Sequence, residues 1–277
     1  MAKEKKEDLK ESGSDGAGLE NKLDVVSAPK LTVVFPYFKA KAQGKELLYA
    51  MRALERNFRE DFQIVVIGDR EDWFSDEVIP IDAVRISDNP QIDTINKIKL
   101  AIADELVSDD FIWMNDDIYC VGPTLLADIQ ILTAAGKLQS IPGTKSIYEQ
   151  NRNNTIDAIA LLGDGKLRIH NYDTHTPFCF NKSKLVTLFE EVGGLNEDGL
   201  LLPSIYFNAY YPDHVPTQLD GKSGNYLLRL VTPSPDKAVF GQFVQDKKFL
   251  NNAETGYAEL LVNFLESKFP TPSRFEK

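Results

Sequence analysis

Two uninterrupted apolar runs near the start of the chain limit its fold more than any other feature. They read LTVVFPYF from Leu31 and FQIVVIGD from Phe62. A strand with one face in water alternates apolar and polar residues, but these runs do not, so we expect both faces to be covered. Such strands are typical of a parallel sheet flanked by helices. Pro36 marks the end of the first run, because proline cannot continue a strand ladder, and it leads into a loop that would face a ligand.

Helical patterns separate the expected strands. ELLYAMRALERNF has apolar residues at spacings of three and four, which predicts an amphipathic helix. A second helix is expected from Thr94 to Leu106, between a short strand at Val84 to Ser87 and the apolar run FIWMNDDIYC. The order strand, helix, strand, strand, helix, strand predicts an α/β fold with an open, mostly parallel sheet flanked by helices. In such a fold the ligand lies outside the carboxyl ends of the strands.

The second half of the chain has a looser pattern. We expect helices from about Lys182 to Val192, from Leu200 to Tyr210 and from Gly256 to Lys268. Residues 1–28 are rich in Lys, Glu, Gly and Ser and are expected to be a disordered tail. Residues 29–277 are expected to form a single domain, with a Rossmann-like nucleotide-binding half at about 29–125 and an acceptor half at about 126–277.

Composition narrows the class of protein. The chain has 277 residues, 43% of them hydrophobic, and a formal net charge of -11. This charge argues against binding nucleic acid through bulk electrostatics. No apolar stretch is long enough to be a secretory signal or an integral membrane segment. Cys120 and Cys179 lie in apolar runs, which is typical of packed thiols in a reducing compartment, so we expect a cytoplasmic protein. The oligomeric state stays open.

The run FIWMNDDIYC places Asn115, Asp116 and Asp117 inside an apolar frame. Adjacent strand residues point to opposite faces, so both carboxylates can serve one site only where the strand ends and the backbone turns. Hard oxygen ligands favour Mg²⁺ or Mn²⁺, with Asp116 and Asp117 as the expected metal residues. The alternative is a plain Asx-type turn, since Asp and Asn are common turn residues.

Other polar residues follow neighbouring elements. Asp69 and Arg70 close the second apolar run, where a carboxylate would accept hydrogen bonds from a ribose or base and Arg70 would face phosphate. Lys97 lies on the helix expected from residue 94 and would steer a donor phosphate. We assign Pro36, Asp69, Arg70, Lys97 and Asn115 to the donor-binding edge. The alternatives are a simple turn for Asp69 and Arg70 and a solvated helix face for the lysine.

Two residues of the second half are further candidates. His175 precedes Pro177 and an apolar stretch, so its imidazole is expected in a fixed loop, as a general base for an acceptor hydroxyl or as a late metal ligand. An incidental loop histidine is the alternative. Asn252 follows an aromatic and basic run and by itself indicates the N-terminal cap of a final helix.

These segments resemble known enzymes. The strand with Asp116 and Asp117 resembles the metal motif of glycosyltransferases with the A-type fold, where an aspartate pair holds Mn²⁺ against the donor diphosphate. Further blocks are similar in order and rough spacing to those of the Stealth family of sugar-phosphate transferases, which includes bacterial capsule polymerases. These blocks are ELLYAMRALERNF with IVVIGD, FIWMNDDIYCVGP, HTPFCFNKSKL and KKFLNN. The opening block of that family is not present, and VVFPYF stands in its place.

The resemblance implies a function. Asp116 and Asp117 would belong to the donor and metal site, His175 would be catalytic, and Asn252 would lie near the active centre. The implied protein is a metal-dependent transferase that moves a sugar or sugar phosphate from a nucleotide-sugar to a carbohydrate hydroxyl, as in polysaccharide or capsule synthesis. Mn²⁺ or Mg²⁺ and a UDP-sugar are the expected cofactor and donor. The alternative is a non-catalytic nucleotide- or carbohydrate-binding protein with the same fold.

Overall fold

The computed structural model describes residues 30–163, 169–194, 198–219, 227–230, 237–245 and 247–277. The tail that the sequence predicts to be disordered, residues 1–28, lies outside the described residues.

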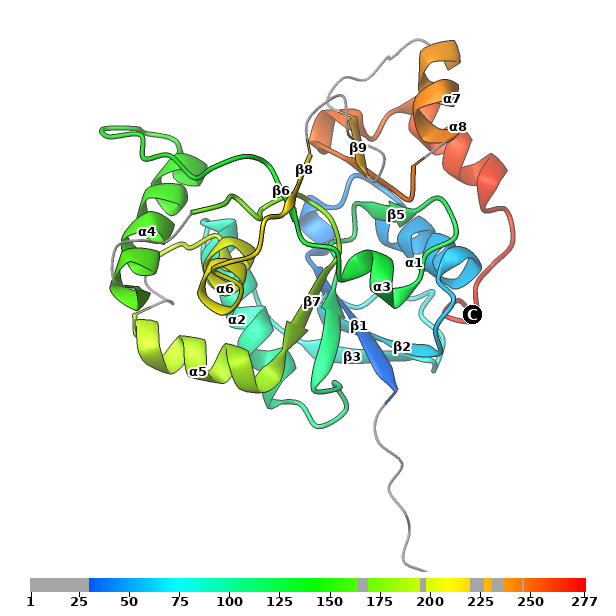
Figure 1. Ribbon diagram of the computed structural model, residues 1–277. Helices are drawn as coiled ribbons and strands as arrows, with labels where there is room; N and C mark the ends of the chain where they lie inside the picture. The colour runs from blue at the N-terminus through cyan, green and yellow to red at the C-terminus, as the bar shows by residue number, and fades with distance from the viewer. Residues whose placement is uncertain (1–29, 164–168, 195–197, 220–226, 231–236, 246) are drawn as a thin grey trace, which may run out of the picture.

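A five-stranded sheet forms the centre of the molecule (Figure 1). Its strands lie in the order β3-β2-β1-β4-β7. All neighbours are parallel except β7, which runs antiparallel to β4. The predicted fold class, an open and mostly parallel sheet flanked by helices, is confirmed. The strands are β1 (Leu31–Tyr37), β2 (Phe62–Gly68), β3 (Val78–Asp82), β4 (Asp110–Trp113) and β7 (Phe178–Asn181).

Helices cover both faces of this sheet because alternate strand residues point to opposite sides. Val33 and Phe35 pack in one apolar core, whereas Val34 packs in the other. The first core also contains residues of α1 (Glu46–Asn57) and α8 (Glu259–Lys268). The second contains residues of α2 (Pro90–Ala103), α4 (Ile147–Leu162), α5 (Lys182–Val192) and α6 (Leu202–Tyr210).

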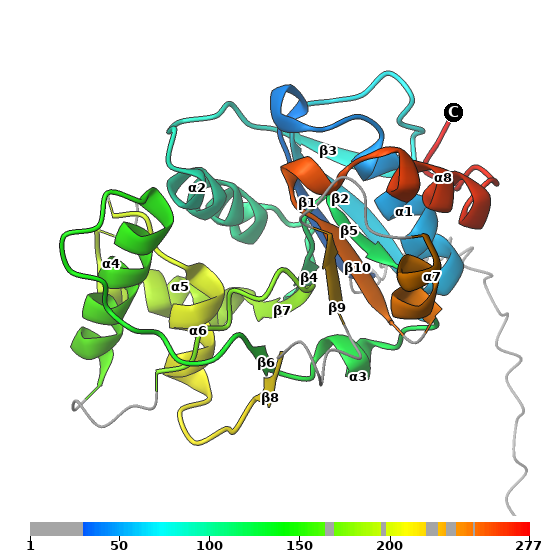
Figure 2. The same cartoon turned by 90° about the horizontal axis from the view of Figure 1, so that it is seen from above.

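Two smaller sheets and several short elements complete the fold (Figure 2). One sheet has the order β5-β10-β9 and the other pairs β6 with β8. The strands are β5 (Ile118–Cys120), β6 (Thr133–Ala134), β8 (Thr217–Gln218), β9 (Leu227–Leu230) and β10 (Phe249–Asn252). The remaining helices are α3 (Leu126–Ile129) and α7 (Lys237–Gln245), with the 3-10 turns η1 (Lys39–Lys41) and η2 (Glu254–Gly256).

The end of the chain returns to the first half of the molecule. Phe275 is fully buried and its ring lies 5.8 Å from that of Phe62. Arg52 on α1 pairs with Glu276 at 2.6 Å.

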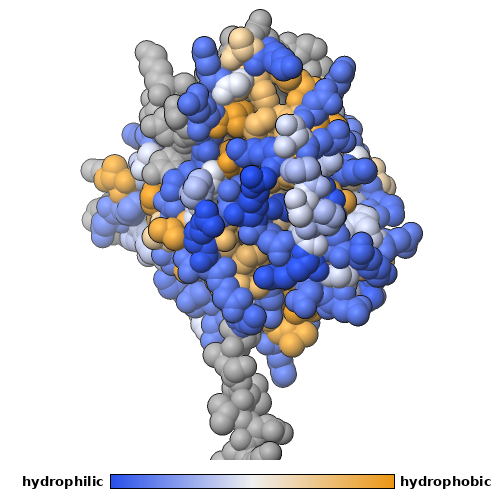
Figure 3. All heavy atoms as spheres, turned by 90° about the vertical axis from the view of Figure 1, so that its right-hand side faces the viewer, coloured by the Kyte–Doolittle hydropathy of each residue, from blue (hydrophilic) through white to orange (hydrophobic). Residues whose placement is uncertain are grey.

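The face seen in Figure 3 is mainly hydrophilic, with apolar residues showing between the polar ones.

Pro36 does not end the first strand as the sequence predicts. The strand continues to Tyr37, with Pro36 aligned to Ile67 of β2. In a parallel sheet the backbone N–H and C=O groups of successive residues point in turn to the strand on one side and the strand on the other. The carbonyl of Val34 points to β4, where it accepts from the N–H of Met114. The nitrogen of Pro36 therefore faces the same side, beyond Trp113, where β4 has already ended. The missing N–H costs no ladder hydrogen bond there.

The strand predicted at residues 84–87 is wrong. The edge strand is β3, which tolerates Pro80 at the sheet border. The guanidinium of Arg85 instead donates to the carbonyl oxygens of Ser87 and Asp88, at 2.8 and 3.1 Å, which suits a bend.

Helix limits also differ from the prediction. The helix expected from Thr94 begins at Pro90, because the side chain of Asn89 accepts from the N–H of Gln91 and proline suits the first helical turn. The final helix begins at Glu259 with Ala258 as its N-cap. Asn252 is therefore not a helix cap but a strand residue of β10.

Other helices of the second half agree with the sequence or were missed by it. The helix at residues 182–192 is confirmed at both ends, and the helix near residues 200–210 is confirmed with a start at Leu202. Helix α4 was not predicted. Its N-terminal turn is capped by Ser146, whose hydroxyl accepts from the N–H of Glu149.

Gly68→Ala should destabilise the fold strongly. Gly68 has φ of +135°, and a Cβ there would lie 1.9 Å from the carbonyl oxygen of Tyr37. We expect the free energy of unfolding in urea to fall by about 3 kcal/mol or more. Gly143→Ala is the control, because Gly143 has φ of +73° and open space around it. A loss for Gly68→Ala no larger than the control loss would contradict the close approach.

Candidate active site

A cleft of about 480 Å³ lies at the carboxyl ends of β1 and β4. In the sheet, β1 lies between β2 and β4. The chain continues from β1 to β2 on one side and only later forms β4 on the other side. The strand order reverses at this point, and such switch points are where open α/β sheets bind their ligands. The described lining is Pro36, Phe38, Lys41, Gln43, Glu46, Arg85, Asp88, Pro90, Asp93, Thr94, Lys97, Asn115, Asp116, Asp117, Asn252 and Glu254.

The local fold brings both aspartates to the cleft. Strand β4 ends at Trp113, and the N–H of Met114 donates to the carbonyl of Val34 at 3.0 Å. A turn follows, in which the N–H of Ile118 donates to the carbonyl of Asn115 at 3.2 Å. Strand β5 then pairs with β10, and the N–H of Asn252 donates to the carbonyl of Asp117 at 3.3 Å. The turn is held at both ends, and both Asp116 and Asp117 line the cleft.

Three carboxylates interact in this part of the cleft. Burial, together with the charges of Asp117 and Glu46, raises the pKa of Asp116 to about 8, and the opposing effect of Lys97 is smaller. Asp116 is half-buried, so its carboxyl group can still be reached from the cleft. The arrangement has a deficit of positive charge beside Asp116 and Asp117.

Glu46 and Asn252 form a buried network beside the aspartates. The amide of Asn252 donates to Glu46 at 2.6 Å, and its oxygen accepts from the hydroxyl of Tyr119 at 2.8 Å. The other oxygen of Glu46 accepts from the N–H of Gln43 at 2.7 Å. Glu46 and Asn252 are 4% and 2% exposed. This network fixes β10 and the start of α1 against the turn that carries Asp117.

Three cations line the cleft: Lys41, Arg85 and Lys97. The ammonium of Lys97 pairs with Asp93 at 3.1 Å and donates to the carbonyl of Tyr37 at 3.2 Å. Lys97 therefore ties α2 to the end of β1. The guanidinium of Arg85 lies 5.3 Å from the ring centre of Phe38. This pair presents a flat cation and an aromatic ring at the mouth of the cleft.

Six residues that the sequence assigns to the site line this one cleft: Pro36, Lys97, Asn115, Asp116, Asp117 and Asn252. The described lining does not include Asp69, Arg70 or His175. Asp69 accepts from the N–H of Lys39 at 2.8 Å and so orders the turn after β1. Arg70 forms an exposed ion pair with Asp82 at 2.7 Å. Their assignment to donor binding stays a prediction.

His175 lies in the loop before β7. Its φ is +53°, which is unusual for a residue other than glycine. The pairing of Phe178 with Trp113 puts this loop at the same edge of the sheet as the aspartates. Its catalytic role stays a prediction.

Sequence analysis missed Glu46, Phe38 and Arg85. Glu46 is the first residue of α1 and follows the loop after β1. Its position after this strand indicates the carboxyl edge of the sheet, so it could have been predicted as a site residue. Phe38 and Arg85 lie in irregular segments, and their contact joins parts of the chain that no local pattern connects.

The donor set suits a hard divalent cation. Among the described residues no three His, Cys, Asp or Glu side chains are grouped to hold a metal by themselves. Mg²⁺ is commonly held by one or two carboxylates together with the phosphates of a substrate, and Mn²⁺ takes the same oxygen ligands. Asp116 and Asp117, with their deficit of positive charge, fit that kind of binding.

Two further features of the described chain bear on its class. Within these residues no helix is both long enough and apolar enough to cross a membrane. Cys120 and Cys179 are free thiols, and burial raises the pKa of each to about 12.

Comparisons with known proteins match solved structures but neither a family model nor a curated protein. No protein-family model matches the chain, and no curated protein matches it. The structure of galactosyltransferase LgtC in complex with donor and acceptor sugar analogs is 13% identical, with 88% of this chain and 98% of that chain covered and a TM-score of 0.46. An active site mutant of LgtC is 11% identical with the same coverage and a TM-score of 0.45. Both similarities are weak, and the chemistry of the site rests on its own residues.

Asp116→Asn should change how stability depends on pH. With a pKa near 8, Asp116 holds a proton in the folded protein that the unfolded chain releases above about pH 4. The free energy of unfolding of the metal-free protein should therefore fall as pH rises from about 4 to about 8. We expect Asp116→Asn to be more stable than the wild type by about 2 kcal/mol at pH 8, with a smaller gain at pH 4.

Chemical denaturation at a series of pH values measures this effect. Asp76→Asn, at an exposed position, should keep the decline of the wild type. A gain for Asp116→Asn that is the same at pH 4 and pH 8 would show that folding does not raise the pKa of Asp116.

Proposed function

We propose that this protein is a metal-dependent transferase that moves a sugar or sugar phosphate from a nucleotide-sugar to a carbohydrate hydroxyl, with a fold of the A-type glycosyltransferase kind. One observation carries the proposal. Two adjacent carboxylates, Asp116 and Asp117, line a cleft at the switch point of an open α/β sheet. That is where such sheets bind nucleotides, and a carboxylate pair of this kind suits a cation bound to a diphosphate.

The charge of the cleft supports a role for a metal. Its described lining has six carboxyl groups, Glu46, Asp88, Asp93, Asp116, Asp117 and Glu254, against three cations, so an excess of negative charge remains even when Asp116 holds a proton. A donor diphosphate would be repelled by this excess of negative charge unless a cation came with it. Mn²⁺ or Mg²⁺, held by Asp116 and Asp117, would supply the positive charge that stabilises the leaving phosphate.

The remaining side chains have separate roles in this proposal. Arg85 and Phe38, which contact each other in the lining of the cleft, would hold the nucleotide. Lys97 keeps the end of β1 and the start of α2 together, and Glu46 with Asn252 fixes the turn of Asp117. His175 would accept the proton of the acceptor hydroxyl from its loop at the same edge of the sheet.

Two reactions fit this site. In sugar transfer the acceptor oxygen bonds to the anomeric carbon and a nucleoside diphosphate leaves. In sugar-phosphate transfer, the reaction of the Stealth family, the oxygen bonds to the β-phosphorus and a nucleoside monophosphate leaves. A UDP-sugar, a polysaccharide acceptor and a cytoplasmic location belong to the same proposal.

Nucleotide release tests the proposal directly. The full chain is incubated with Mn²⁺, a panel of nucleotide-sugars and simple sugar acceptors, and released nucleotide is measured. We expect release that requires Mn²⁺ and that falls by about 100-fold or more in Asp117→Asn, because the charge on the leaving phosphate is then poorly balanced. The product, diphosphate or monophosphate, separates the two reactions.

Asp76→Asn is the matched control, because Asp76 is an exposed carboxylate that is not in the described lining of the cleft. Its release should equal that of the wild type. Nucleotide binding that depends on Mn²⁺ without any release would instead identify a binding protein. The absence of both release and binding would overturn the proposal.

A further inference from the structure

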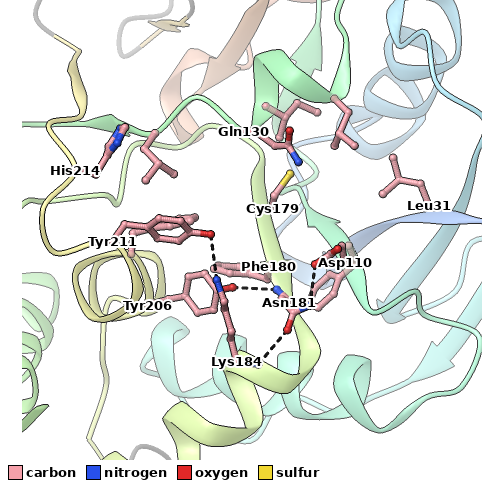
Figure 4. A pocket seen from close by; sticks show the side chains of 15 residues that line it. Leu31, Asp110, Gln130, Cys179, Phe180, Asn181, Lys184, Tyr206, Tyr211 and His214 are labelled. Carbon is pink, nitrogen blue, oxygen red and sulfur yellow. Dashed lines mark hydrogen bonds between the residues drawn. The ribbon is translucent and has the colours of Figure 1, made fainter.

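A second cavity lies at the opposite edge of the central sheet (Figure 4). Its volume is about 430 Å³. Leu31 at the start of β1, Asp110 at the start of β4 and Asn181 at the end of antiparallel β7 all line it. These positions mark the amino-terminal edge, whereas the candidate active site lies at the carboxyl edge. The described linings of the two cavities have no residue in common.

The free side of β7 explains why this cavity exists. Strand β7 is the last of the sheet, and the N–H of Lys182 donates to the carbonyl of Asp109 at 2.8 Å. Along an antiparallel strand the backbone N–H and C=O groups of successive residues point alternately toward and away from the paired strand. The backbone groups of Phe180 therefore face β4, and those of Cys179 face away from it. The N–H of Asn181 points the same way as Cys179 and donates to the hydroxyl of Tyr206 at 3.1 Å. The cavity runs along this side of the strand.

Apolar side chains form most of one wall. Leu126 and Ile129 come from α3, Leu132 follows it, and Phe207 comes from α6. A cavity of this size with an apolar wall and a few polar groups is typical of a site for a small molecule.

Three hydrogen-bond donors converge on this apolar space: Lys184, Tyr206 and Tyr211. The oxygen of Tyr211 accepts from the ammonium of Lys184 at 3.4 Å, and the oxygen of Tyr206 accepts from Asn181. Each phenol therefore keeps its own proton for a further acceptor. In the described part of the chain no side chain accepts either proton.

Lys184 has no carboxylate partner among the described residues. Its ammonium lies instead over the rings of Tyr210 and Tyr211, 5.3 and 4.8 Å from their centres. Cation–π contacts leave its remaining N–H groups available to an anion. The one acidic residue of the described lining, Asp110, accepts from the amide of Asn181 at 2.8 Å.

We propose that this cavity binds a small amphipathic anion. The anionic group, a carboxylate or a phosphate monoester, accepts from Lys184, Tyr206 and Tyr211. The apolar body packs on Leu126, Ile129 and Leu132. This binding site is separate from the transferase site and does not depend on the function proposed for it.

Calorimetric titration of the full chain with octanoate, octyl phosphate and octan-1-ol tests the proposal. We expect saturable binding of at least one of the two anions, and binding of the alcohol that is at least tenfold weaker because it lacks the charge that Lys184 attracts. The stronger of the two anions identifies the head group. Lys184→Gln should weaken binding of that anion about tenfold, and Tyr211→Phe should weaken it less.

Lys145→Gln is the control for net charge, because Lys145 is exposed and does not line the cavity. It should bind the anion as the wild type does. Thermal unfolding of each variant shows whether the fold is kept. Equal affinity for octanoate, octyl phosphate and octan-1-ol, unchanged affinity in folded Lys184→Gln, or no binding of either anion would each overturn the proposal.

Discussion

The pairing of β1 with β2 on one side and with β4 on the other determines where everything else lies. Because all three strands are parallel, their carboxyl ends meet at one edge, and the reversal of strand order leaves a cleft there. The short length of β4 is part of this arrangement. It ends at Trp113, which pairs with Val34, three positions before β1 ends, so Asn115 to Asp117 turn into the space that the missing pairs leave. A longer β4 would keep the two aspartates on opposite faces.

Placing carboxylates together in a poorly hydrated cleft is unfavourable, and the surrounding structure offsets this only in part. Each carboxylate oxygen of Glu46 accepts a hydrogen bond, one from the amide of Asn252 and the other from the N–H of Gln43. Asp93 is paired with Lys97. Asp116 has no comparable balance, and its raised pKa reflects that. Proteins commonly keep such strain where a ligand relieves it. A cation that arrives with an anionic substrate would relieve it here, which connects the energetics of the fold with the proposed reaction.

Much of the fold could be predicted from the sequence, because continuous apolar runs and helical spacing report burial directly. The runs at Leu31 and Phe62 gave parallel strands, and residues 182–192 gave a helix with both ends right. The site was only partly predictable. Asp116 and Asp117 are adjacent in sequence, so a local pattern shows them. Glu46 and Asn252 are far apart in the chain and meet only through the pairing of β5 with β10, which no local pattern reports. For the same reason the sequence predicts a helix cap at Asn252, whereas the structure has a strand there.

The central claim is that Asp116 and Asp117 hold a divalent cation against a diphosphate. Phosphorus NMR of a nucleoside diphosphate with the protein and substoichiometric Mn²⁺ tests it most directly, because bound paramagnetic Mn²⁺ broadens nearby phosphorus signals. We expect the folded wild-type protein to add broadening beyond that of Mn²⁺ and nucleotide alone. We expect a folded Asp116→Asn, Asp117→Asn double variant to add none. Equal added broadening by the wild type and the double variant, or none by either, would contradict it.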